Sequence, residues 1–253
     1  MDWMTRLAQF TTADYAALAL LFASWIAIGY AVEHPPRRRP SVSGLMARYR
    51  RDWMVQMITR QPRIFDAQTL STLRQGTAFF ASATMIAIGG CLALLGNMER
   101  FIGIARDLTL ESDPEIVWEI KILVVLVFLS NAFLKFVWSH RLFGYCAVLM
   151  AAVPNDPEDP LALPRAGKAG EINITAARGF NRGLRSLYFA LAAAAWMLGA
   201  AVLAGAVVLA CLVLLRREFA SHSRRVLMQP EDGTSHSRGG DTAAHGESRN
   251  LGS

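Results

Sequence analysis

Four hydrophobic stretches, separated by connections of which two are rich in arginine, constrain this chain more than any other feature of its sequence. They cover residues 15–32, 77–96, 116–138 and 186–215. Each approaches or exceeds the roughly 20 residues that a helix needs to cross about 30 Å of hydrocarbon. Because 53% of the residues are hydrophobic and only 18% are charged, no large soluble core is expected. The sequence predicts an all-α membrane protein, a bundle of about four transmembrane helices.

The fourth stretch is expected to form one long span, because splitting it in two would leave segments too short to cross a membrane. As one helix it is longer than the hydrocarbon thickness, which implies tilt or protrusion into the headgroups. The apolar segment 141–153 is too short to span and is expected to continue the third helix, although five spans or a re-entrant segment remain an alternative. Residues 1–228 then form one integral membrane domain. Residues 229–253 lack aromatic side chains and are predicted to be a disordered tail.

The distribution of basic residues predicts the orientation. Nine Lys and Arg lie between residues 33 and 76, two between 97 and 115, and six between 139 and 185. The first and third connections should therefore be cytoplasmic, with both termini outside. Arg216, Arg217, Arg224 and Arg225 conflict with this orientation because they closely follow the fourth stretch. An odd number of spans would remove the conflict.

The first connection contains a predicted amphipathic helix. Its apolar side chains between residues 45 and 57 share one face at helical spacing. The candidate residues for binding anionic headgroups or a partner are Arg48, Arg50, Arg51 and Trp53. The alternative is a topology anchor that packs on its own bundle.

Three arginines precede the fourth stretch at positions i, i+4 and i+7, namely Arg178, Arg182 and Arg185, with Asn181 beside them. A helix would place them on one face. Because guanidinium groups pair with planar anions, this stripe could bind a lipid or ligand phosphate. The favoured alternative is that it clamps carboxylates of the first connection, for which the candidates are Asp52 and Asp66.

The third stretch carries Lys121, Asn131 and Lys135 on one helical stripe. Polar residues within a membrane are functional candidates, and these three could line the path of a transporter or channel for an anionic or polar solute. The two lysines are about 21 Å apart along a helix, so each could instead extend to its own interface.

No catalytic or metal site is predicted, and no cofactor. Cys91, Cys146 and Cys211 are isolated, and His34 and His140 are only a weak candidate pair for haem. The net charge of +6 lies largely in the flanks of the spans, where orientation explains it, so nucleic acid is not an expected partner. Catalysis by dispersed intramembrane residues would leave no pattern in one sequence.

Several segments resemble the Domain of Unknown Function family 599, over about residues 15–225. They are Arg50–Met54, Asp66–Leu73, Phe79–Ser82, Lys121 with Leu129–Asn131, and Ala177–Arg178 through Tyr188–Phe189. The resemblance implies a multi-pass membrane protein without an assigned reaction.

These observations favour a non-enzymatic interaction or scaffold protein. Its basic cytoplasmic face is expected to bind lipid headgroups or a partner membrane protein, with the transporter as the alternative. Small residues at four-residue spacing, such as Ala83 and Ala87, also allow a homo-oligomer. The Ala- and Arg-rich composition indicates a bacterial inner-membrane protein.

Overall fold

The computed structural model describes residues 9–36, 39–100, 102–103 and 114–230, and every regular element within these ranges is helical. The helices are α2 (Thr12–Glu33), α3 (Val42–Ile58), α4 (Ile64–Leu95), α6 (Glu115–Ala151), α7 (Ala162–Ala194), η1 (Ala195–Leu198), α8 (Ala200–Phe219) and α9 (His222–Leu227). The predicted all-α fold is confirmed. The predicted tail lies outside the described residues from residue 231 onward.

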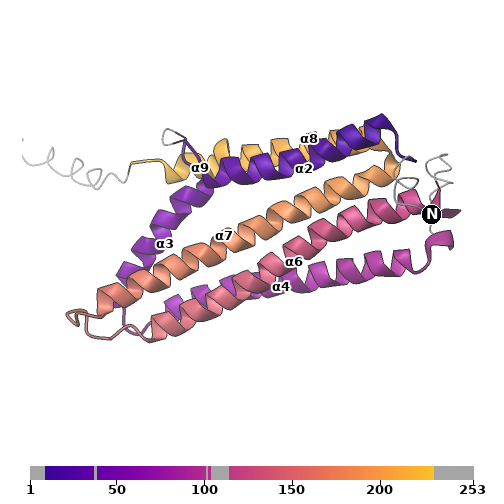
Figure 1. Ribbon diagram of the computed structural model, residues 1–253. Helices are drawn as coiled ribbons and strands as arrows, with labels where there is room; N and C mark the ends of the chain where they lie inside the picture. Colours follow the sequence, from indigo (N-terminus) through magenta and orange to yellow (C-terminus); the bar gives the residue numbers. More distant parts are fainter. Residues whose placement is uncertain (1–8, 37–38, 101, 104–113, 231–253) are drawn as a thin grey trace, which may run out of the picture.

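The long helices run side by side in an elongated bundle, and consecutive ones point in opposite directions (Figure 1). Helix α7 packs along α6 on one side and contacts α2 and α8 on the other, while α4 packs on α6. The shorter α3 leaves the end of α2 obliquely and crosses to α7 (Figure 1).

The first three hydrophobic stretches lie within α2, α4 and α6. Four helical segments are long and apolar enough to cross a membrane, namely Thr12–Glu33, Ile64–Leu95, Glu115–Ala151 and Ala200–Leu227. Helix α6 includes nearly all of residues 141–153, which confirms that this segment continues the third helix. At 1.5 Å per residue, α4 and α6 are about 48 and 55 Å long, so both extend well beyond the hydrocarbon.

The prediction of one continuous helix over residues 186–215 is wrong. Helix α7 ends at Ala194, a single 3₁₀ turn follows, and α8 begins at Ala200. Gly199 between them has φ 107°, a conformation that glycine adopts without the steric cost of a Cβ atom. Apolar residues continue through the turn, so hydropathy alone gives no sign of the reversal. Most of α7 consists of the more polar residues that precede Ser186, because the helix begins at Ala162.

This reversal brings the end of α8 and the segment that follows it next to the first connection. The Arg224 Nε donates to the Pro40 carbonyl at 2.9 Å, and the Ser43 hydroxyl donates to Glu218 at 3.2 Å. At the opposite end, Trp196 Nε1 donates to Asp14 at 2.8 Å. The first and last described residues lie at opposite ends of the bundle (Figure 1). The prediction that both termini lie on the outer side of the membrane was based on an even number of antiparallel spans.

The bundle contains a separate apolar core beyond the level of the predicted spans. Helix α3 buries Met54 and Met57 there, against Leu70 of α4, Phe143 of α6 and the start of α7. Helix α3 is the predicted amphipathic helix, and its apolar face packs on its own bundle. We call this end, with the described residues of 34–36, 39–76, 139–185 and 216–225, the basic end.

Candidate functional site

Two neighbouring cavities open at the basic end, with volumes of about 340 and 210 Å³. Both are lined by Ser43 of α3 and by Arg178 and Asn181 of α7. We call the pair the arginine cleft. The larger cavity reaches the end of α2 at Glu33, and the smaller one reaches the end of α8 at Arg217. Four helices therefore supply one polar site.

Two arginines of the predicted stripe clamp the end of α2. Arg182 Nε and Arg185 Nη2 donate to the same oxygen of Glu33, at 2.7 and 2.6 Å, and Arg182 also binds the second oxygen. Arg185 is 8% exposed, so Glu33 supplies the charge that makes its burial tolerable. These two residues thus contact a carboxylate, as the structural interpretation of the stripe expected, but the carboxylate is that of Glu33 and not of Asp52 or Asp66.

The third arginine of the stripe has no such partner. Arg178 is exposed and makes no hydrogen bond or salt bridge to any residue that the structure describes. Beside it, the Asn181 amide donates to the Ser43 hydroxyl at 3.2 Å, and Ser43 in turn contacts Glu218. The carboxylate of Glu218 is thus engaged by Ser43, and Arg178 is left facing the cleft.

Arg50 is the only residue of the predicted α3 group that lines the cleft. Its Nη1 donates to the neutral Asn173 amide oxygen, and burial lowers the pKa of its guanidinium. The charged residues that line the two cavities are Arg50, Arg178, Arg182, Arg185 and Arg217 against Glu33 and Glu218. Five positive and two negative charges leave an excess of three positive charges.

The other predicted α3 residues lie outside the cleft. Arg48 is exposed, and its guanidinium lies 5.5 Å from the ring centre of Tyr49. Arg51 forms a surface salt bridge with Glu171 at 2.6 Å, and its hydrogen bond lowers the pKa of that carboxyl.

Trp53 anchors the start of α4 and does not line the cleft. Its Nε1 donates at 2.7 Å to Asp66, which is fully buried and also binds Arg60. This is why Asp66 is not available to the arginine stripe.

The three polar residues of the third stretch lie in different surroundings. Lys121 is 2% exposed and lies 4.8 Å from the ring centre of Trp118, so it does not extend to solvent. The Asn131 amide donates to the Ser186 hydroxyl across the α6–α7 interface at 2.5 Å. Lys135 is partly exposed, and none of the three lines the arginine cleft.

Among the described residues, no group of three or more His, Cys, Asp and Glu side chains is close enough to hold a metal ion. The candidate pair His34 and His140 have separate neighbours. His34 contacts the Tyr30 carbonyl, and His140 contacts the Thr77 hydroxyl.

The sequence interpretation missed Glu33, Ser43, Arg217 and Glu218. The only local signal was the position of Glu33, an acid at the end of a hydrophobic stretch followed by three arginines. Contacts between residues more than a hundred positions apart leave no spacing pattern.

Fold and site together define an all-α membrane protein with a basic cleft at one end of its helical bundle. The chain belongs to the family described as "Protein of unknown function, DUF599", whose family model matches residues 16–223. No curated protein and no solved structure matches the chain.

Proposed function

We propose that the arginine cleft binds the phosphate of an anionic membrane lipid, and that the protein acts as a non-enzymatic interaction protein of the membrane surface. The observation that carries this proposal is Arg178, whose guanidinium makes no hydrogen bond or salt bridge to a described residue and lies in a cleft with three excess positive charges. A guanidinium can donate two parallel hydrogen bonds to phosphate, which makes it the appropriate group for this ligand.

The position of the cleft along the bundle suits a lipid headgroup. Glu33 is the last residue of α2, and Arg217 lies two residues after Leu215, where the apolar part of α8 ends, so both mark the end of a hydrophobic segment. A phosphate in the cleft would therefore lie at headgroup level while its acyl chains stay in the hydrocarbon.

The proposal includes an orientation. With the basic end on the cytoplasmic side, the arginines of the first connection, of α7 and of the segment after α8 all obey the positive-inside rule. This orientation needs α7 to complete a fifth crossing, with the N-terminus outside and the C-terminus inside. We propose the inner membrane of a bacterium as the location.

Each residue of the cleft has a distinct part in the proposed binding. Glu33 holds Arg182 and Arg185 in place, and Asn181 is fixed by Ser43. The cleft is thus preorganised around Arg178, which keeps its full hydrogen-bonding capacity for the ligand.

The test compares Arg178→Gln with Arg48→Gln, which removes the same charge from an exposed residue of the same end that does not line the cleft. Each variant is reconstituted in nanodiscs with a mixture of phosphatidylglycerol and phosphatidylcholine, and retained lipid is measured by native mass spectrometry. Loss of one charge-assisted hydrogen bond predicts about tenfold weaker retention of phosphatidylglycerol for Arg178→Gln only. Equal retention by the two folded variants would refute the proposal, and selective loss of a copurified protein would indicate a protein partner instead.

A further inference from the structure

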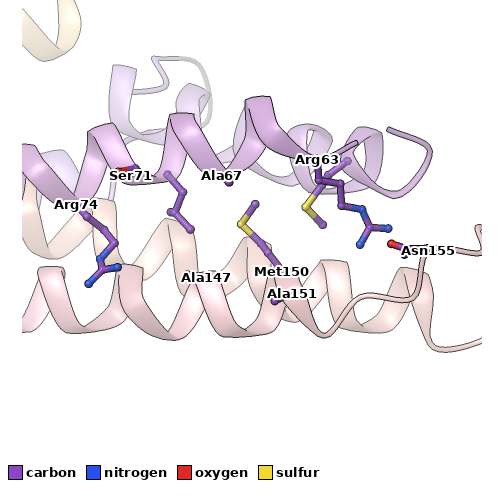
Figure 2. A pocket seen from close by; sticks show the side chains of 10 residues that line it. Arg63, Ala67, Ser71, Arg74, Ala147, Met150, Ala151 and Asn155 are labelled. Atoms are coloured by element: carbon purple, nitrogen blue, oxygen red, sulfur yellow. The ribbon is translucent and has the colours of Figure 1, made fainter. Parts of the chain in front are cut away.

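A third cavity lies in the basic end between α4 and α6, with a volume of about 370 Å³. Figure 2 shows it as a slot between the two helices, with Arg74 at one end and Arg63 beside Asn155 at the other. We call it the apolar slot. Its lining does not overlap with that of the arginine cleft.

The slot exists because the facing positions of the two helices carry small side chains. Ala67 and Ser71 are one turn apart on α4, and Ala147 and Ala151 are one turn apart on α6. Larger residues at these positions would close the gap between the helices. The groove is therefore a consequence of side-chain size.

The lining of the slot is largely apolar and adaptable. Met57, Leu70 and Met150 line the slot, and all three belong to the separate apolar core of the basic end. Methionine side chains adjust to irregular apolar ligands because they are unbranched and flexible. A surface of this kind favours a hydrocarbon chain over ordered water, which needs polar partners.

The two arginines at the ends of the slot differ in what they can still bind. Arg63 Nη1 and Nη2 donate to the carbonyls of Val153 and Pro154, both at 2.7 Å, and only its buried Nε lacks an acceptor. Arg74 is exposed, and its guanidinium makes no hydrogen bond or salt bridge to a described residue. The available cation is therefore Arg74, three residues before the apolar stretch of α4 begins.

We propose that the apolar slot binds a long-chain fatty acid, with the carboxylate on Arg74 and the hydrocarbon chain along Leu70, Met57 and Met150. Arg74 lies eleven positions after Arg63, which corresponds to about 16 Å along a helix, so the slot offers roughly that length to the chain. The carboxylate complements the unpaired cation, and its position at the membrane edge lets a fatty acid enter from the bilayer. This site is independent of the arginine cleft and of the function proposed for it.

The experiment uses the full chain in phosphatidylcholine nanodiscs and a palmitate analogue with a photoreactive diazirine in its chain. After irradiation, the labelled peptides are identified by mass spectrometry. We expect labels on peptides that contain Met57, Leu70 or Met150, and unmodified palmitate should compete for them. Labels confined to residues 77–95 and 116–138 would overturn the proposal, because the probe would then report only the bilayer.

Two matched pairs of variants test the two parts of the site. Ala67→Leu fills the slot, whereas Gln68→Leu adds the same side chain to the next, exposed residue that does not line it. We expect at least about tenfold less labelling for the first and no change for the second. If Ala67→Leu does not fold, Ala151→Leu fills the slot from α6. Equal labelling of the filled variant and its control would refute the site.

The second pair is Arg74→Gln and Arg63→Gln. We expect Arg74→Gln to need about tenfold more probe for the same labelling, since a charge-assisted hydrogen bond is lost. A stronger effect from Arg63→Gln would place the carboxylate at the opposite end and overturn the proposed arrangement. A phosphatidylglycerol retention assay on Arg74→Gln should remain normal, which separates this result from a failure of the arginine cleft.

Discussion

Replacing Gly183 by alanine should weaken the packing of α7 on α6 just where the arginine cleft is built. A Cβ atom at Gly183 would lie 2.6, 2.8 and 2.9 Å from three carbons of the Phe136 ring. Ordinary carbon contacts are about 3.5 to 4.0 Å, so the ring must move by roughly 1 Å. Phe136 is fully buried and packs on Phe80 and Phe180, which leaves little room for that movement.

The magnitude follows from two opposing effects. Overpacking a tight site costs about 1 to 3 kcal/mol, while replacing glycine by alanine within a helix gains about 1 kcal/mol. The control is Gly167→Ala in the same helix, where an added Cβ meets no atom within 4 Å and only the gain applies. The free energy of unfolding of the Gly183 variant should therefore be about 1 to 3 kcal/mol lower than that of the Gly167 variant.

The assay is reversible unfolding of the purified protein in mild detergent, followed by tryptophan fluorescence. The second control is the same substitution in a Phe136→Leu variant, because the smaller side chain removes the clash. Gly183→Ala should then lower the free energy of unfolding much less than it does in the wild type. If the two glycine variants unfold alike in the wild-type background, the inferred close contact between α6 and α7 is refuted.

Three further predictions concern polar contacts. Glu33→Gln leaves the buried Arg185 without its carboxylate and should lower the free energy of unfolding by about 3 kcal/mol. A loss of less than about 1 kcal/mol, as expected for an exposed ion pair, would contradict the contact of Glu33 with Arg185. Glu171→Gln at the exposed pair with Arg51 should cost less than about 1 kcal/mol. Because Arg51 lowers the pKa of Glu171, this contribution is present above the ordinary carboxyl pKa and disappears as the pH falls through the lowered value. A pH series of wild type and variant checks this, and a difference that grew on acidification would be inconsistent. Asn131→Leu should cost about 1 kcal/mol in the same unfolding assay, and an unchanged stability would argue against its hydrogen bond across the α6–α7 interface.

The parts of the fold that the sequence predicted are those specified by local patterns. Apolar length alone identified α2, α4 and α6, and the helical spacing of Arg178 and Arg185 correctly placed them on one helix. The reversal at Gly199 was missed because one glycine within an Ala-rich apolar stretch has no local signature. The partner of the stripe was missed because Glu33 is 152 positions from Arg185, and only tertiary packing brings them together.

The positive-inside rule explains on which side of a membrane basic residues lie, but it does not explain why they converge on one cleft. Arg50, Arg178 and Arg217 come from three separate helices, and the reversal at Gly199 is what returns α8 to the end of α2. Mutual repulsion of these side chains disfavours such convergence unless acids balance them. Glu33 and Glu218 balance only part of the charge. An anion bound at Arg178 would reduce the remaining excess, so ligand binding should stabilise the folded bundle. Added phosphatidylglycerol should therefore raise the unfolding temperature of the wild type more than that of Arg178→Gln.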